Sequence, residues 1–372
     1  HNIKKMRSRK NTVITLIGFI AILASCTSAK INHSNENFIL EESLQARDVK
    51  QYFSYKDFSA KTISELNSYI KDSQLSSDEL NNLKKLRSNI RKIASKEDFI
   101  IYTGKSNIYS FELIQLIYGL DLPIQIKWDQ SDKKYISQNV LSEAPLGFCS
   151  SLYEDALETI ATEVSSSSDS ALLVYSEGFS DEKNFLTDQF PKINSILFKK
   201  DDPQLFAAET LGINSSNKRF KKITSLNPNQ KLEFSARPRH DVQKIFLLLE
   251  PAQFQSVFPA FRYHGGNKFQ YVNFISSLEA LNNTNQLLDF ENSSVTLSER
   301  LSQNIRSKEI TSLEGIMQRS MLHDWLLIEI IKQAGIRSAD IDGMTGTLKF
   351  QRNSCTTRSL PMQRINSNWI NS

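Results

Sequence analysis

Few of the residues that build metal and redox centres are present in this 372-residue chain, which holds three cysteines and five histidines. No His-Glu-x-x-His, no Cys-x-x-Cys and no other pair with metal-ligand spacing occurs, so the sequence predicts no metal site. The Gly-x-Ser-x-Gly nucleophile elbow, the P-loop and the Gly-x-Gly-x-x-Gly fingerprint are also absent. We therefore expect no cofactor and no enzyme activity.

The chain also lacks a sustained excess of charge once its first segment is set apart. Its formal net charge is +4, but five basic residues and no acidic residue precede Cys26. Removing that segment leaves +4 minus 5, which is −1. A nearly neutral remainder gives no electrostatic reason to expect nucleic acid or another polyanion as a partner. With 40% hydrophobic residues, the chain can still bury one large core or two medium ones.

The N-terminal segment has the three parts of a bacterial lipoprotein signal peptide. A basic stretch, Met6–Lys10, precedes an uncharged apolar run from Thr12 to Leu23. That run is short for a membrane-spanning helix, which needs about 20 residues, and it suits a signal-peptide core. It ends in Leu-Ala-Ser-Cys26, which resembles a lipobox. We expect residues 1–25 to be removed and Cys26 to be lipidated.

Lipidation of Cys26 would anchor the protein to a membrane. Each buried CH₂ of an acyl chain contributes about 0.8 kcal/mol, so several chains together hold a protein firmly. Thr27 stands where an aspartate would resemble an inner-membrane retention signal. The prediction is therefore an outer-membrane lipoprotein that faces the periplasm. The alternative is an ordinary signal peptide with an incidental cysteine.

The other two cysteines, Cys149 and Cys355, lie far apart in the sequence. The periplasm permits disulfides, yet a pair at this separation cannot be assigned from the sequence. We expect both thiols to be unpaired, with a disulfide as the alternative.

A polar tether and a small helical region follow the anchor. Residues 26–37 are polar and predict a flexible tether. Within a predicted helical region at residues 38–96, Ile63, Leu66 and Ile70 recur at spacings of three and four. Leu80–Ile93 repeats this pattern, and Ser77 is the predicted N-cap of its helix.

Residues 97–372 alternate apolar runs with helical patterns. The apolar run Ile245–Leu249 follows a polar lead-in, and an uninterrupted run predicts a central strand buried on both faces. Alternating strands and helices predict a mostly parallel α/β architecture. Further strands are expected at Phe99–Tyr102, Ile124–Trp128, Ala171–Tyr175, Phe269–Ile275 and Leu313–Met317, with a closing hairpin at Thr345–Phe350 and Thr356–Leu360.

Helices are expected between these strands. Ser151 and Glu154 have capping-box spacing at the start of one helix. Met321–Ala334 is apolar nearly all round and predicts a buried helix that ends at Gly335. The other predicted helices are Tyr109–Leu120, Asp181–Phe190, Pro203–Leu211, Asn217–Leu226 and the segment after Pro251, with its stripe of Phe254, Val257, Phe258 and Phe261.

Two groups of polar residues are candidates for a site. Arg237, Arg239 and Asp241 are the densest charged cluster beside a strand, and they indicate either a surface ion-pair set or a contact with an anionic ligand or partner. His323 and Asp324 are neighbours on the predicted buried helix, and adjacent residues on a helix do not face each other. We therefore expect no acid–base pair there.

Several segments resemble one known family in the same order. They are the Arg-rich lead-in and strand of Arg237–Pro251, the strand and turn of Ala171–Gly178, and the closing Gly343-Met-Thr-Gly-Thr-Leu348 with Arg358-Ser-Leu360. Together with the lipobox, they resemble the LppC/LpoA-like lipoproteins, the outer-membrane activators of penicillin-binding proteins.

The resemblance implies a type I periplasmic-binding-protein-like fold, in which two lobes of parallel sheet flanked by helices enclose a cleft. It places this domain at residues 97–372, with the second lobe at roughly 150–265. The chain departs from the family in its first lobe, which lacks the leading strand–helix units, so we expect that lobe to be incomplete. It implies a non-enzymatic lipoprotein that binds and activates a class A penicillin-binding protein. The alternative is a lipid-anchored periplasmic protein of the same fold that binds a small molecule.

Overall fold

The computed structural model describes residues 60–72, 75–104, 107–120, 122–129, 135–199, 202–226, 228, 231–281, 284–306 and 312–366. The predicted signal peptide, the lipidation site Cys26 and the tether lie outside these residues, as does the start of the predicted helical region. Among the described residues, no helix combines the length and the apolar character needed to cross a bilayer.

Two helices that pack on each other form the first described part. They are α3 (Ala60–Asp72) and α4 (Ser77–Ala94). The side chains of Leu66 on α3 and Leu83 on α4 are fully buried. The N-cap of α4 is Ser76, not the predicted Ser77. Ser76 is the residue that completes a capping box with the glutamate three positions on, and its backbone N donates to the Glu79 carboxylate at 2.9 Å.

The first lobe begins with a β-α-β unit. The parallel strands β1 (Phe99–Gly104) and β2 (Ile124–Asp129) are joined through α5 (Ser110–Tyr118). The side chain of Gln333 accepts from the backbone N of Ile100 at 2.8 Å and donates to its carbonyl at 2.6 Å. This amide takes the place of a neighbouring strand at the edge of β1. Within the described residues the parallel sheet of this lobe has two strands, and an incomplete first lobe stays a prediction.

The second lobe is a six-stranded sheet in the order β11-β7-β6-β5-β3-β4. All neighbours are parallel except β11, which runs antiparallel to β7. The central strand β5 is fully buried from Ile245 to Leu248, as its continuous apolar run predicts. The strands are β3 (Ala171–Tyr175), β4 (Asn194–Leu197), β5 (Lys244–Leu248), β6 (Gln270–Asn273), β7 (Ser293–Thr296) and β11 (Met362–Ile365). This sheet reaches further along the chain than the predicted 150–265 segment.

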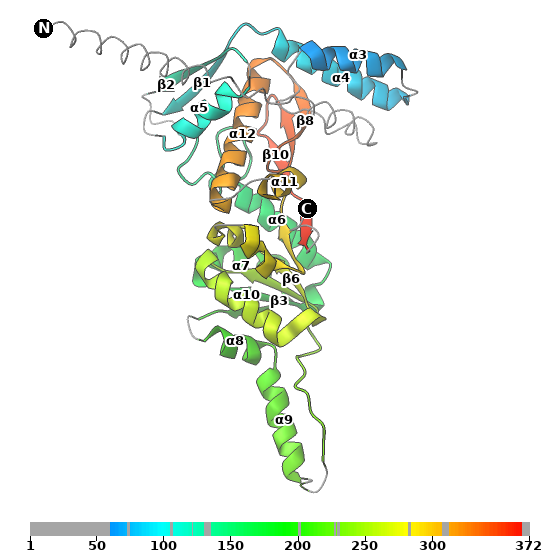
Figure 1. Cartoon of the computed structure of the whole chain (residues 1–372), viewed down its shortest axis with the longest axis vertical. Coiled ribbons are helices and arrows are strands. Elements are labelled where there is room, and N and C mark those ends of the chain that lie inside the picture. The colour runs from blue at the N-terminus through cyan, green and yellow to red at the C-terminus, as the bar shows by residue number, and fades with distance from the viewer. Residues whose placement is uncertain are drawn as a thin grey trace, which may run out of the picture. The chain divides into compact units, whose positions relative to one another are not determined.

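Helices flank this sheet in Figure 1, where α7 and α10 lie over its strands and α9 extends away from it. The aromatic stripe of α10 is part of the core, since Phe258 meets Tyr271 of β6 at 5.5 Å between ring centroids. The helices are α6 (Leu152–Ser165), α7 (Ser180–Gln189), α8 (Pro203–Thr210), α9 (Ile213–Leu226) and α10 (Pro251–Gly265), with the 3₁₀ helices η4 (Ser168–Ser170), η5 (Glu177–Phe179), η6 (Gly266–Lys268), η7 (Ile275–Ala280) and η8 (Thr284–Phe290).

The chain then returns to the first lobe through α11 (Glu299–Arg306) and the buried helix α12 (Leu313–Gln333). The predicted strand Leu313–Met317 is wrong, because these residues form the first turn of α12. A short apolar run suits a strand or a buried helix equally, and here the Ser312 hydroxyl caps the helix by accepting from Gly315 N. Gly335 follows α12 with a φ of 69°, as expected of a residue that ends a helix.

A small antiparallel sheet, in the order β10-β9-β8, completes the first lobe. It consists of β8 (Ser338–Asp342), β9 (Thr347–Gln351) and β10 (Thr357–Ser359). The predicted closing hairpin is confirmed as β9 and β10. From β10 the chain crosses back to β11 in the second-lobe sheet.

Candidate functional site

The predicted charged cluster is an ion pair on the surface. Arg239 Nε donates to Asp241 Oδ1 at 2.8 Å, and the second guanidinium nitrogen contacts Oδ2, so the pair is bidentate. The hydrogen bonds from Arg239 lower the pKa of Asp241 to about 2. Arg237 is exposed, and its backbone N donates to Ser216 Oγ at 3.3 Å. The three residues therefore lie together at the lead-in to β5, and a partner contact there remains a prediction.

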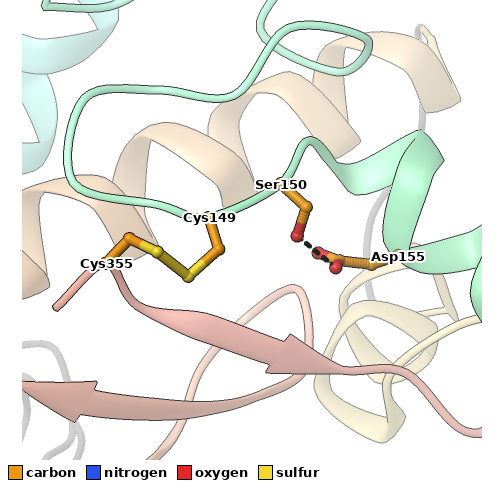
Figure 2. The surroundings of a disulfide bond; sticks show 4 residues. All are labelled: Cys149, Ser150, Asp155 and Cys355. Atoms are coloured by element: carbon orange, nitrogen blue, oxygen red, sulfur yellow. Dashed lines mark hydrogen bonds between the residues drawn. A yellow bond between two sulfur atoms is a disulfide. The ribbon is translucent and has the colours of Figure 1, made fainter.

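A disulfide joins Cys149 to Cys355, so the expectation of unpaired thiols is wrong. The two residues are 206 positions apart, and their Cα atoms lie 4.9 Å from each other (Figure 2). Backbone hydrogen bonds align the two segments, because Cys149 N donates to Thr356 O at 3.0 Å and Thr356 N donates to Gly147 O at 2.7 Å. This pairing depends on tertiary structure and has no local signal in the sequence.

Next to the disulfide, a buried ion pair connects β10 to α6. The side chain of Arg358 is fully buried and donates to Asp155 Oδ2 at 2.7 Å. Ser150 also donates to this carboxylate (Figure 2), and the guanidinium lies 5.0 Å from the centre of the Phe148 ring. Burial raises the pKa of Asp155, and the charge of Arg358 partly offsets that rise. Asp155 and Arg358 are 203 positions apart, and no local pattern in the sequence pairs them.

Asp324 organises the turn that begins the closing hairpin. Its fully buried carboxylate accepts from Met344 N at 2.7 Å, Thr345 N at 2.8 Å and the Thr345 hydroxyl at 2.5 Å. Burial raises the pKa of Asp324, but the contact with His323 and the hydrogen bonds from Thr345 outweigh it and lower the pKa. At Gly343, a Cβ would lie 2.9 Å from Asp324 Oδ2, so glycine permits this close approach.

His323 does reach its neighbour, contrary to the expectation from helix geometry. Its Nδ1 lies 3.3 Å from Asp324 Oδ1. The same carboxylate is occupied by the turn described above, so the contact supports the hairpin. His323 also lines a cavity of about 160 Å³ between α5 and α12, with Leu116, Arg319 and Leu326 among the other lining residues. This cavity is small, and the polar side chains of Gln115, Arg319 and His323 line it together with apolar ones.

The chain passes between the two lobes three times, and each passage is held by such contacts. The first runs from β2 to α6 and carries Cys149. The second runs from β7 to α12, where Ser298 Oγ donates to Met344 O at 2.5 Å and Arg300 Nε donates to Asp342 Oδ2 at 2.6 Å. The third leads from β10 to β11 just after Arg358. We use "junction" for the disulfide, the Asp155–Arg358 and Arg300–Asp342 pairs, and Asp324 with the turn it holds.

The described residues contain no group of three or more histidine, cysteine, aspartate or glutamate side chains placed to hold a metal ion. The charged groups of the junction are paired with one another or with the backbone.

The lobes together define the class of fold. A mostly parallel sheet flanked by helices, connected three times to a second α/β lobe, is a type I periplasmic-binding-protein-like architecture. Strand order, parallel register and helix positions carry this conclusion.

Several proteins of known structure have a fold similar to that of this chain. The fold is similar to Haemophilus influenzae LpoA, with 12% identity and a TM-score of 0.43 over 84% of this chain and 73% of that one. A putative branched-chain amino acid ABC transporter protein from Rhodospirillum rubrum follows, with 10% identity and a TM-score of 0.34 over 83% of each chain. A substrate-binding protein from Desulfitobacterium hafniense, in complex with Leu, has 8% identity and a TM-score of 0.37 over 73% of this chain and 98% of that one. No family model and no curated protein matches the sequence.

Proposed function

We propose that this chain is a non-enzymatic regulatory lipoprotein that binds and activates a class A penicillin-binding protein. In this proposal, Cys26 carries the lipid anchor, and the protein faces the periplasm from the outer membrane. The lipobox motif and the ordered segments that resemble the LppC/LpoA-like family motivate it.

The junction is the observation that carries the proposal. A receptor that closes on a small molecule needs hinge residues in the connections between its lobes, because those residues absorb the change in backbone angles. Here a disulfide, a buried arginine–carboxylate pair and an aspartate-held turn tie these connections together. Such bracing favours lobes that keep a fixed arrangement and present a constant surface to a protein partner.

Binding and stimulation can be measured with the chain from residue 27 onward and a class A penicillin-binding protein of the same organism in detergent. We expect saturable binding, and faster glycan polymerisation when the protein is added. Synthase inactivated at its glycan-polymerising site serves as the control that separates binding from turnover. No binding and an unchanged polymerisation rate would contradict the proposal.

One observation favours the second candidate, a small-molecule receptor of the same fold. Asn273 Oδ1, Ser276 Oγ and Thr296 Oγ1 are buried and have no hydrogen-bond partner within the described residues. They lie at or just beyond the carboxyl ends of β6 and β7, where ligands of open α/β sheets bind. Thermal-shift screening with amino acids and muropeptides tests this candidate, since a bound ligand raises stability by RT ln(1 + [L]/Kd).

A further inference from the structure

Residues 213–237, between α8 and β5, extend away from the second-lobe sheet, and we name this segment the arm. Gly212 opens it with a φ of 75°, a conformation that side chains other than glycine rarely adopt. Helix α9 forms its outgoing part, and residues 231–237 return alongside (Figure 1). The two ends meet at the base, where Arg239 N donates to Leu211 O at 2.8 Å.

The base of the arm is fastened to the second lobe, and its own apolar residues hold the two parts together. Lys268 Nζ donates to the carbonyls of Pro238 at 2.9 Å and Arg239 at 3.1 Å. Within the arm, the rings of Phe220 and Phe234 stack with centroids 4.1 Å apart. The arm therefore has a defined attachment and a defined internal packing.

The arm concentrates positive charge that the whole-chain total conceals. It contains six cations and one acid, Glu233, which gives +5. Taking the predicted signal peptide (+5) and the arm (+5) from the total of +4 leaves −6 for the rest of the chain. All six cations are exposed, and no carboxylate of a described residue forms an ion pair with them. They are Lys218, Arg219, Lys221, Lys222, Lys231 and Arg237.

The arrangement of these charges favours a protein over a lipid bilayer as the binding partner. At roughly 100° per residue, the four cations of α9 cover about 160° of the helix circumference. Leu226, which is 73% exposed, lies within that arc, and Ile223, which is 52% exposed, lies about 40° beyond its edge. Helices that lie on membranes separate a broad apolar face from a basic face, whereas Phe220 already packs on Phe234 here. Two exposed apolar side chains beside exposed cations suit the arrangement of a protein interface, in which a polar rim surrounds an apolar centre.

We propose that the arm docks on an acidic surface of the partner protein, with its cations facing carboxylates and with Ile223 and Leu226 as apolar anchors. This inference rests on the proposed function, and the partner is the class A penicillin-binding protein. Opposite charges at an interface speed association and make it sensitive to salt. Binding through the arm should therefore weaken as ionic strength rises.

The test reverses three arm charges in the chain from residue 27 onward. The variant K218E/K221E/K222E is compared with K84E/K85E/K92E, which makes the same charge change at exposed positions of α4. We expect the arm variant to bind the detergent-solubilised synthase about 100-fold more weakly, because like charges would then meet across the interface. The α4 variant should stay within about 3-fold of the wild type. Urea unfolding with equal midpoints for the three proteins would confirm that each folds.

The outcomes separate the two proposals. If the wild type binds the synthase and the arm variant binds equally well, the arm inference is wrong and the proposed function stands. If the wild type does not bind at all, the proposed function fails and the arm inference fails with it. Vesicles with about one-fifth anionic lipid are the second probe. Loss of wild-type vesicle binding in the arm variant, with synthase binding unchanged, would assign the arm to a membrane and overturn the inference.

Discussion

The junction and the arm hold charge in opposite ways. Arg358 in the junction is fully buried, and Asp155 lies 2.7 Å from it, so neither charge is available to another molecule. The arm places six exposed cations on a helix and its return segment, with one acid among them. A buried charge must be paired, since an unpaired one is costly, whereas an exposed charge costs little and remains available to a partner. We therefore expect the junction to govern stability and the arm to govern binding.

Removing the buried arginine should produce the largest effect. Arg358→Ala leaves the carboxylate of Asp155 buried without its cation, which costs about 3–5 kcal/mol of unfolding free energy. Urea unfolding at neutral pH measures this loss. Arg352→Ala, at an exposed position of the same hairpin, is the control and should change the free energy by less than about 0.5 kcal/mol. A loss below about 1 kcal/mol for Arg358→Ala would contradict this account of the junction.

Removing the disulfide should have the next largest effect. The double variant Cys149→Ser with Cys355→Ser opens a link between residues 206 positions apart. Disulfides that close long loops typically contribute about 2–4 kcal/mol, largely by restricting the unfolded chain. The check is urea unfolding with and without reductant. Reductant should destabilise the wild type and leave the double variant unchanged, and equal stability of the two oxidised proteins would refute the prediction.

Glu279 should have an effect of intermediate size on stability, because it is a half-buried acid with another acid nearby. Burial first, and then the charge of Glu314, raise its pKa from 4.5 to about 7. Between these two values the folded state binds more protons than the unfolded chain, so the free energy of unfolding falls as pH rises through this window. After allowance for solvent screening, we expect a fall of about 1–2 kcal/mol.

Glu279→Gln should remove this pH dependence and stabilise the protein at pH 8. Glu314→Gln is the matched variant and should remove only part of it, because burial is the larger cause of the pKa rise. Unfolding curves at closely spaced pH values between 4.5 and 8 measure both effects. A slope that survives Glu279→Gln would assign the pH dependence to another group.

Substitutions in the arm should change the global stability of the protein least. Phe220→Ala removes the stack on Phe234 that joins the two parts of the arm. We expect faster amide hydrogen exchange in α9, with less than about 1 kcal/mol change in global unfolding, because the arm can open while the rest stays folded. Phe258→Ala in the α10 core is the contrasting variant, and it should cost about 3–5 kcal/mol. Comparable global losses for the two variants would show that the arm is part of the core.

The sequence predicts the parts of this fold that have local signals. The apolar run at Ile245–Leu249 predicts the buried central strand, and Ser151 with Glu154 predicts the capping box, whose two hydrogen bonds are 3.1 and 2.7 Å long. Strands β7 and β11 were missed because they are short and carry polar residues such as Ser294 and Arg364. Runs this short that contain polar residues show neither the continuous apolar pattern nor the alternation that predicts a strand.

The candidate site was less predictable because its members come from distant segments. Asp155 meets Arg358 only after α6 and β10 have packed, and Asp324 meets Thr345 only after α12 has packed on the hairpin turn. The disulfide likewise needs the pairing of two separate loops. The arm is different, since its charge is visible in the sequence. Summed over the chain after the predicted signal peptide, the +5 of the arm and the −6 of the other residues nearly cancel. A count over residues 213–237 alone shows the positive charge of the arm.

The distance between the lobes tests the central claim, that the junction keeps them in one arrangement. Spin labels at Lys332→Cys on α12 and Asp188→Cys on α7, in a chain that begins at residue 27 and keeps the native disulfide, report this distance by pulsed electron resonance. We predict one narrow distribution that amino acids and muropeptides leave unchanged. A second, shorter population that grows on adding one of these ligands would contradict the claim and indicate a receptor that closes.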